Sequence, residues 1–242
     1  MIIAGLQKTT LIDYPGKIAC VVFLAVCNFR CPWCYSSELV LPVKIAKQPR
    51  LSEKEFFDFI RKRQGLLEGV VICGGEPTVN KELPKFIEKI KNLPASRQGG
   101  GFSVKLDTNG SNPEMLKNLV DAKLIDYVAM DIKSSPNNQI YKSILGEGVK
   151  FADIEESVNF LKNSNIDFEF RTTVVNTIHK KEEFSEIAKW IGGNNVKYYL
   201  QNFRPEKTID PEFEKVKPFN REFLENIVKE ISPFFKVCAL RS

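Results

Sequence analysis

Apolar runs of strand length alternate with amphipathic stretches of helical period along most of the chain. The strand-like runs are IACVVFLAV (18–26), GVVICGG (69–75), FSVKLDTNG (102–110), YVAMDIK (127–133), DFEFRTTVV (167–175) and VKYYLQNF (196–203). Helical periodicity lies at residues 51–63, 81–93, 112–123, 152–164, 180–193 and 221–231, and FKVCALR (235–241) is typical of a last short strand. Six strands with helices between nearly all of them predict a parallel α/β fold.

Unusual polar residues follow these strands rather than precede them. They are the cysteines after the first run, GGEPT (74–78), DTNG (107–110), DIK (131–133) and QNFRP (201–205), with Arg171 inside the fifth run. In barrel-like α/β folds, chemistry lies at the carboxyl ends of the strands. The pattern therefore predicts a functional site on one face.

Composition limits the class of protein. The chain has 242 residues, of which 43% are apolar and 27% charged, as in ordinary globular proteins. We expect a single domain over 1–242, with a core at about 16–204 and a C-terminal helical extension at about 205–242. No apolar run reaches membrane-spanning length and no signal peptide is evident, so we expect a cytoplasmic protein with reduced thiols and no membrane partner.

The net charge of +5 indicates a lysine-rich solvated surface. The alternative is a basic face for a nucleic acid or an acidic protein. No run of five or more basic residues marks such a face, so we expect no nucleic-acid partner.

Three of the six cysteines lie within eight positions, CNFRCPWC, with the spacing Cys27-x3-Cys31-x2-Cys34. Thiolates hold iron–sulfur clusters, and three of them on a four-iron cube leave one iron open for another ligand. The alternatives are buried thiols or a structural zinc site, which needs four ligands. A fourth ligand could be Cys20, Cys73 or His179, none of which has the usual finger spacing.

The CxxxCxxC motif after a first strand, with Trp33 before the third cysteine, resembles the radical S-adenosylmethionine (SAM) superfamily. GLQKTTLIDYPGKIACVVFL (5–24), GGEPT, DTNG, MDIK (130–133), EFRTTVV (169–175) and LQNFRP (200–205) resemble its glycyl-radical-enzyme activating branch. Within that branch the sequence is most similar to the activating proteins of anaerobic ribonucleoside-triphosphate reductase. The resemblance implies an incomplete (β/α)6 TIM-like barrel with parallel strands.

The resemblance also implies a role for each matching residue. Cys27, Cys31 and Cys34 would ligate a [4Fe–4S] cluster that binds SAM. Trp33 is implied to lie near the adenine of SAM, and Gly74, Gly75 and Glu76 at its methionine end. Asp107, Thr108 and Asn109 are implied on the ribose and methionine side. Lys133 and Arg171, the two implied catalytic residues, would lie at the carboxylate and sulfonium. Asp107, Thr108 and Asp131, with the carbonyl of Ala129, resemble a monovalent-cation site.

Other interpretations of these residues stay open. GGEP alone would be read as a turn, Arg171 as an inward barrel residue paired with an acid, and Asp131 with Lys133 as an ion pair. The sequence departs from the family at Val26, where relatives carry glycine, and at Tyr35. Cys20, Cys73 and Cys238 are interpreted as buried thiols, and His179 as a surface residue.

The resemblance implies an anaerobic oxidoreductase that cleaves SAM reductively. The resulting 5′-deoxyadenosyl radical would make a glycyl radical on a partner, which is expected to be anaerobic ribonucleotide reductase. A flavodoxin or ferredoxin type protein would donate the electron. The alternatives are a radical enzyme acting on a small molecule, such as a deazapurine-forming type, or on a nucleic acid, and a non-enzymatic zinc or cluster module.

Overall fold

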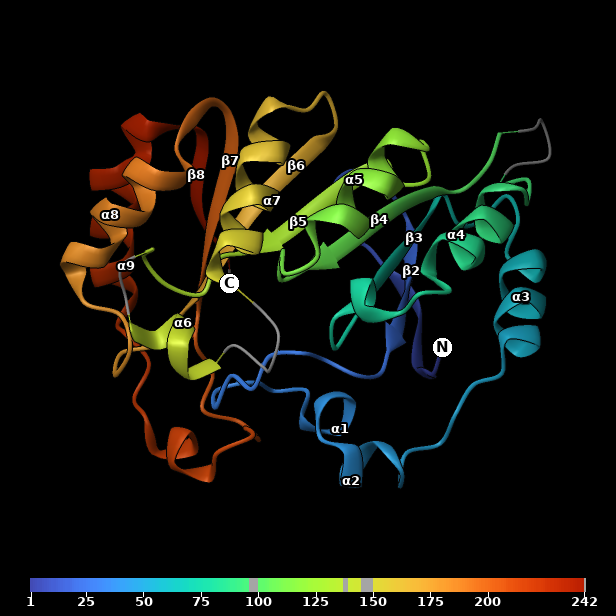
Figure 1. Cartoon of the computed structure of the whole chain (residues 1–242), viewed down its shortest axis with the longest axis horizontal. Helices are drawn as coiled ribbons and strands as arrows, with labels where there is room; N and C mark the ends of the chain where they lie inside the picture. Colours follow the sequence, from blue (N-terminus) through green and yellow to red (C-terminus); the bar gives the residue numbers. More distant parts are fainter. Residues whose placement is uncertain (96–99, 137–138, 145–149, 242) are drawn as a thin grey trace. The chain divides into compact units, whose positions relative to one another are not determined.

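The computed structural model describes residues 1–95, 100–136, 139–144 and 150–241. Its strands are β1 (Ile3–Thr10), β2 (Ala19–Leu24), β3 (Gly69–Gly74), β4 (Ser103–Thr108), β5 (Tyr127–Asp131), β6 (Asp167–Val174), β7 (Gly193–Asn202) and β8 (Phe235–Arg241). Its helices are α1 (Ser37–Val40), α2 (Pro42–Ile45), α3 (Glu53–Lys62), α4 (Leu83–Lys91), α5 (Pro113–Asp121), α6 (Gln139–Ile144), α7 (Phe151–Asn163), α8 (Lys181–Ile191) and α9 (Arg221–Ile231), with 3-10 turns η1 (Pro77–Val79), η2 (Pro211–Lys215) and η3 (Ser232–Phe234) (Figure 1).

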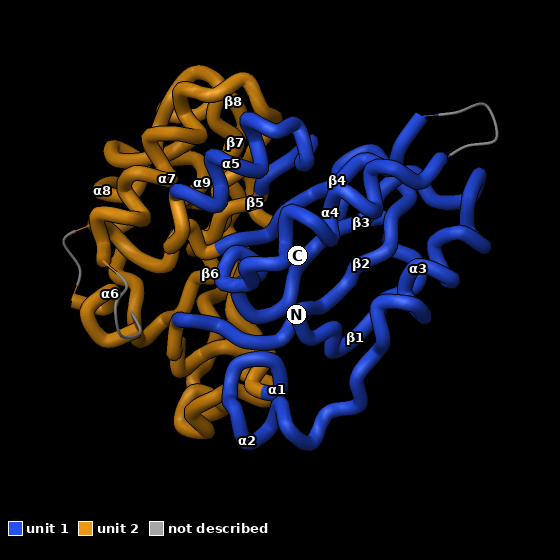
Figure 2. The backbone as a smooth tube through the Cα atoms, turned by 45° about the vertical axis from the view of Figure 1, so that its right-hand side comes forward, with its two compact units in different colours: residues 1–28, 38–108, 114–128 blue, residues 29–37, 109–113, 129–242 orange. Residues whose placement is uncertain are grey.

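The chain forms two compact units, which Figure 2 distinguishes by colour. Unit 1 comprises 1–28, 38–108 and 114–128, and unit 2 comprises 29–37, 109–113 and 129–242. In hydrogen-bonding order, the strands follow the sequence from β1 to β8. The expectation of a single domain stays a prediction.

Unit 1 is built on strands β1 to β4. β2 pairs parallel with β3, and β3 with β4, whereas β1 pairs antiparallel with β2. Helix α3 starts with a capping box between Ser52 and Glu55, as expected of a serine followed three residues later by a glutamate. Phe56 of α3 packs against Phe86 of α4 with ring centroids 5.2 Å apart, so the two helices share one apolar cluster.

Unit 2 is built on the parallel strands β6, β7 and β8. Even-numbered residues of β6, such as Phe170, are fully buried, and the odd-numbered series carries Glu169, Arg171 and Thr173. Because side chains alternate between the faces of a strand, the charged residues of β6 share one face. Helices α8 and α9 lie side by side in this unit (Figure 1).

The predicted strands and helices are confirmed, with ends that coincide or differ by up to three residues. The sequence interpretation missed β1, α1, α2 and α6. Strand β1 escaped it because its exposure does not alternate regularly and its pairing with β2 contains register shifts. The loop expected at RQGGG (97–101) lies partly outside the described residues.

Candidate active site

The two glycines at the end of β3 in unit 1, Gly74 and Gly75, lie against the backbone that leads into Cys27. A Cβ added to Gly74 would stand 2.1 Å from the carbonyl oxygen of Leu24, and one added to Gly75 would stand 2.1 Å from that of Val26. The amide of Gly75 donates to the Leu24 carbonyl at 2.8 Å, and that of Glu76 donates to the Val26 carbonyl at 2.8 Å. Protein packing therefore explains why both positions are glycine, and the implied contact with a ligand stays a prediction.

Val26 has a φ of +80°, a conformation that costs a β-branched residue free energy. Its amide donates to the Leu39 carbonyl at 2.7 Å. With Gly75 and Glu76 on one side and Leu39 on the other, the chain just before Cys27 is fixed by main-chain contacts. The departure from glycine at Val26 therefore introduces backbone strain at this position.

Glu76 is 1% exposed, and one of its carboxylate oxygens, Oε1, accepts three hydrogen bonds. The Thr78 amide donates at 3.1 Å, the Thr78 hydroxyl at 2.6 Å and the Thr108 hydroxyl at 2.7 Å. Thr108 ends β4, so Glu76 joins the carboxyl ends of two neighbouring strands. The implied contact of Glu76 with the methionine end of SAM stays a prediction.

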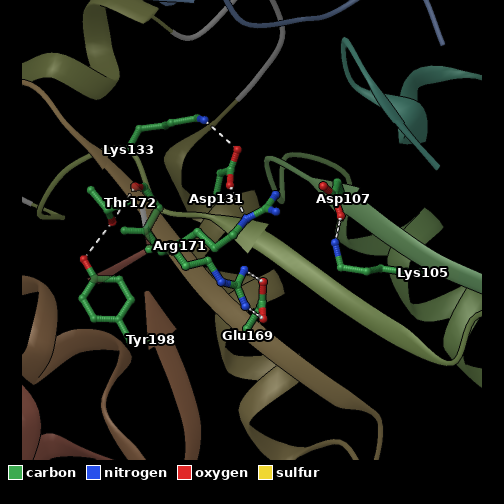
Figure 3. Close-up of polar contacts among 10 residues, drawn as sticks. Lys105, Asp107, Asp131, Lys133, Glu169, Arg171, Thr172 and Tyr198 are labelled. Atoms are coloured by element: carbon green, nitrogen blue, oxygen red, sulfur yellow. Dashed lines mark hydrogen bonds and ion pairs between the residues drawn. The ribbon is translucent and has the colours of Figure 1, made fainter. Parts of the chain in front are cut away.

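Asp107 forms an ion pair with Lys105, the residue two positions earlier on β4 (Figure 3). The Lys105 side chain is 1% exposed, so this lysine is buried with its counter-ion. Asn109, which belongs to unit 2, accepts a hydrogen bond from the Ser111 amide at 2.9 Å. The Asn109 side chain thus stabilises the turn after β4.

Asp131 of unit 2 lies between two basic side chains, as Figure 3 shows. Lys133 Nζ is 2.9 Å from one carboxylate oxygen, and Arg171 Nε is 3.1 Å from the other. Burial raises the pKa of Asp131, but the charges and hydrogen bonds of Lys133 and Arg171 outweigh it and bring that pKa to about 2. The three groups together carry one net positive charge.

The same cluster faces the cysteine loop of unit 2. Burial lowers the pKa of Lys133, but Asp131 and the thiols of Cys31 and Cys34 outweigh it and raise that pKa. Lys133 therefore stays protonated near the two cysteines. Its ammonium and the Arg171 guanidinium are the basic groups expected to meet the SAM carboxylate, which stays a prediction.

His179 is buried, with 1% exposure, so its interpretation as a surface residue was wrong. Its Nδ1 accepts from the Val175 amide at 3.0 Å, and its Nε2 lies 2.9 Å from the Lys133 carbonyl. This geometry assigns the proton to Nε2. Sequence reasoning missed the role because no pattern pairs this lone histidine with the loop after β5.

Further contacts hold the loop that carries Lys133. The Tyr141 hydroxyl accepts from the Lys133 amide at 2.9 Å, and the Ser134 hydroxyl donates to Glu183 at 2.8 Å. Tyr141 lies on α6, which the sequence interpretation did not find. The main chain at Lys133 is thus bound at its amide by Tyr141 and at its carbonyl by His179.

The Cys31–Cys34 loop is fastened to the segment after β7. The Cys34 amide donates to the Cys31 carbonyl at 3.0 Å, which closes a tight turn. The amides of Ile209 and Asp210 donate to the carbonyls of Cys34 at 3.1 Å and Pro32 at 2.9 Å. No sequence pattern indicates this long-range contact.

The aromatic residues of this loop pack against the same segment. Trp33 is 3% exposed and its ring centroid lies 6.2 Å from that of Phe213. Tyr35 stacks on Phe203 with centroids 5.7 Å apart, and its hydroxyl accepts from the Arg204 amide at 2.7 Å. Trp33 is therefore largely covered by protein, and its expected contact with an adenine stays a prediction.

All six cysteines are free thiols. Cys20 is fully buried, as expected, and burial raises its pKa to about 12, which makes it a poor ligand. Burial likewise raises the pKa of Cys238 to about 12. Cys73 and Cys238 are only partly buried, so the interpretation of buried thiols holds fully for Cys20 alone.

Cys27 belongs to unit 1, whereas Cys31 and Cys34 belong to unit 2. Among the residues described, no three cysteine, histidine, aspartate or glutamate side chains are grouped as a metal site. The thiol set suits an iron–sulfur cluster by its donor chemistry. For the monovalent cation, Asp107 and Asp131 each already have a basic partner, Lys105 and Lys133. The cluster and cation ligands stay predictions.

Comparisons with known proteins place these residues in context. The model of the radical SAM superfamily matches residues 21–191. A Methanocaldococcus jannaschii protein named "Putative glycyl-radical enzyme activating enzyme MJ1227" is 32% identical over 97% of this chain and 92% of its own length. The 7-carboxy-7-deazaguanine synthase of Aquifex aeolicus is 33% identical over 40% of this chain and 38% of its own.

A solved radical SAM methyltransferase from Sphaerobacter thermophilus superposes with a TM-score of 0.68 at 16% identity, over 96% of this chain and 68% of that one. This likeness shows that the α/β fold is of the radical SAM type. In the described part of the chain, no helix is long and apolar enough to span a membrane.

Proposed function

This chain belongs to the radical SAM superfamily, and on that premise we propose that it is an activating enzyme that generates a glycyl radical on a partner protein. The partner we propose is an anaerobic ribonucleoside-triphosphate reductase. The observation that carries the proposal is the 32% identity to the M. jannaschii protein, which extends over 97% of this chain and 92% of that one.

The residues fit the group that the family implies. Cys27, Cys31 and Cys34 are free thiols, the donors that iron–sulfur clusters take. When bound, a [4Fe–4S] cluster would supply the electron that cleaves SAM reductively, so that the resulting 5′-deoxyadenosyl radical can take hydrogen from a glycine Cα. A flavodoxin or ferredoxin type protein is the reductant proposed to reduce it.

The chain's own residues would bind and orient SAM. Lys133 and Arg171 would face its carboxylate, and the Asp131 between them keeps both side chains in place. Glu76 and the main chain at Gly74 and Gly75 would position the amino end. The only histidine in the chain, His179, is occupied by main-chain contacts, so the site offers no imidazole for acid–base chemistry. Radical chemistry needs none.

Label transfer tests this proposal. A reductase carrying deuterated glycine is mixed anaerobically with the reconstituted protein, SAM and a reductant. We expect deuterium in the 5′-deoxyadenosine and a glycyl radical signal in electron paramagnetic resonance (EPR). SAM cleavage with no transfer of label from the reductase would contradict the proposal. The anaerobic setting and a cytoplasmic location stay predictions.

A small-molecule substrate is the second candidate. It is favoured by the 33% identity to the A. aeolicus 7-carboxy-7-deazaguanine synthase, although this covers only 40% of the present chain. Label transfer to 5′-deoxyadenosine from a deuterated purine precursor, in place of glycine, would identify this class.

A further inference from the structure

The Arg171 guanidinium is placed between two carboxylates of unit 2. One is Asp131 of β5, which accepts a hydrogen bond from Arg171 Nε at 3.1 Å (Figure 3). The other is Glu169, which precedes Arg171 by two positions on β6 and therefore lies on the same face of that strand. Residues two apart on a strand stand about 7 Å from each other, a span that an arginine side chain can bridge. The position of Arg171 on β6 thus gives it two carboxylates to choose from.

Arg241, on β8, binds the carboxylate of Glu169. Its Nη1 and Nη2 atoms donate to the two carboxylate oxygens, Nη2 at 2.7 Å. A bidentate pair of this kind is strong and fixes the direction of both side chains. The Glu169 side chain is 0% exposed and that of Arg241 is 31% exposed, so water does not neutralise the carboxylate. A buried carboxylate needs a cation, and Arg241 is one.

The strand register explains how Arg241 reaches β6 from β8. Arg241 is the partner of Gln201 on β7, and Tyr199 lies two positions before Gln201, on the same face of that strand. Tyr199 is in turn the partner of Arg171 on β6. The guanidinium carbon of Arg241 lies 3.8 Å from the centroid of the Tyr199 ring, a cation–π contact. The ring of Tyr199 thus supports the Arg241 side chain on its way to Glu169.

The two guanidinium groups lie near each other. Burial lowers the pKa of Arg241, but the hydrogen bond and the charge of Glu169 outweigh it and raise that pKa. The positive charge of Arg171 opposes this rise, so the two cations are close enough to repel each other. In the structure they bind different carboxylates, Arg241 that of Glu169 and Arg171 that of Asp131.

Removal of Arg241 would upset this division. Glu169 would keep its charge in a fully buried position, where the loss of a counter-ion is costly. Arg171 is a cation on the same face of the same strand, and its movement toward Glu169 would relieve that cost. Arg171 would then leave Asp131.

We propose that Arg241 is a positioning residue for Arg171. It occupies the Glu169 carboxylate and so leaves the Arg171 guanidinium bound to Asp131, which also pairs with Lys133. The consequence for SAM rests on the proposed function, because it takes Arg171 to meet the SAM carboxylate. The choice of partner by Arg171 does not depend on SAM.

The 15N–1H signal of Arg171 Nε in nuclear magnetic resonance spectra of the full-length protein reports which carboxylate Arg171 binds. The signal is assigned by its absence in Arg171→Lys. We expect it to shift in R241M and to return to the wild-type position in E169Q/R241M, because a neutral amide no longer attracts Arg171. The control Lys197→Met removes another cation that pairs with β6, 3.3 Å from Asp167, and should leave the signal unchanged.

Calorimetry of SAM binding to the anaerobically reconstituted protein gives the second readout. We expect the Kd to rise about tenfold in R241M, as for the loss of a hydrogen bond to a charged group. In E169Q/R241M it should return to within about threefold of wild type, since the competing carboxylate is gone. Lys197→Met should bind SAM as wild type does.

The outcomes separate this inference from the proposed function. An Arg171 signal that R241M leaves in place, or a shift that E169Q does not reverse, would overturn the inference, because Arg241 would then only fasten β8. A shift that E169Q reverses, with an unchanged Kd for SAM, would support the positioning of Arg171 and refute its proposed contact with SAM. If wild type binds no SAM, the proposed function fails, and the Arg171 signal still decides the inference.

Arg241→Lys keeps the test valid if R241M does not fold. It retains a cation for Glu169 but not the contact with both oxygens, so the Arg171 signal should shift in the same direction by a smaller amount. An unchanged Arg171 signal in a folded Arg241→Lys variant would likewise overturn the inference.

Discussion

The segment 24–27 of unit 1 and the segment 131–133 of unit 2 each begin at the last residue of a buried strand, yet different contacts hold them in place. In unit 1 the contacts are between main chains, and the carbonyls of Leu24 and Val26 lie where a Cβ at Gly74 or Gly75 would be. In unit 2 side chains hold the segment: Asp131 forms ion pairs with Lys133 and Arg171, and the main chain at Lys133 is bonded by the side chains of Tyr141 and His179.

This difference predicts opposite responses to mutation. Main-chain packing has no room for an added methyl group, so even alanine should displace the segment. An ionic cluster depends on charge and reach, so a substitution that keeps the charge should be tolerated and one that removes it should not.

Gly75→Ala should destabilise unit 1 the most. Its new Cβ would meet the Val26 carbonyl oxygen at 2.1 Å, and backbone would have to move. We expect the free energy of unfolding to fall by about 3 kcal/mol, measured by chemical denaturation, with less iron bound after reconstitution. Gly65→Ala is the control, since Gly65 has a φ of +79° but open space around it, and should lose about 1 kcal/mol. Equal losses in both variants would contradict the packing argument.

Lys133→Met should weaken SAM binding because it removes the ammonium but keeps the length of the side chain. We expect the Kd, measured by calorimetry on the anaerobically reconstituted protein, to rise about tenfold to hundredfold, as for hydrogen bonds to charged groups. Lys133→Arg keeps the charge beside Asp131 and should stay within a few-fold of wild type. If Lys133→Met binds SAM as tightly as Lys133→Arg does, the charge at this position does not contribute to SAM binding.

The free energy of unfolding should fall in mild acid because His179 is buried. Burial lowers the pKa of His179, so the unfolded state binds the proton more readily than the folded state. The stability contributed by the neutral histidine is full well above pH 6.5, the ordinary histidine pKa, and should fall by at most about 1.4 kcal/mol by pH 5.5.

The lone histidine makes this test specific. Glu183 and Lys133 face His179 with opposite effects on its pKa, and the pKa of Asp131, at about 2, lies outside the window. Denaturation of wild type and His179→Gln at pH 7.5 and 5.5 measures the effect, and the variant should lose less stability. An equally steep loss in the variant would assign the pH dependence to other groups.

Val26→Gly should stabilise unit 1 slightly. Val26 adopts a φ of +80°, which glycine reaches without strain, although glycine also raises the entropy of the unfolded chain. We expect a net gain of about 1 kcal/mol in the free energy of unfolding. A loss of stability would mean that the Val26 side chain, 43% exposed, makes contacts that outweigh its backbone strain.

The sequence predicted the strands, the main helices and the edge of the sheet that carries the polar residues, because periodicity and turn residues are local signals. The ion pair of Lys105 with Asp107 was also within reach, since the two residues are two positions apart on one strand. The contacts of Tyr35 with Arg204, of Trp33 with Phe213 and of His179 with Lys133 join segments distant in the sequence. No local pattern encodes them, and they decide which of these side chains can meet a ligand.

The central claim is that Cys27, Cys31 and Cys34 hold a cluster to which SAM binds. EPR of the anaerobically reconstituted and reduced protein, recorded with and without SAM, tests it most directly. The account predicts a [4Fe–4S]⁺ signal that shifts when SAM is added and that is lost in Cys31→Ala but kept in Cys20→Ala. Absence of a cluster, or a signal that SAM does not change, would contradict it.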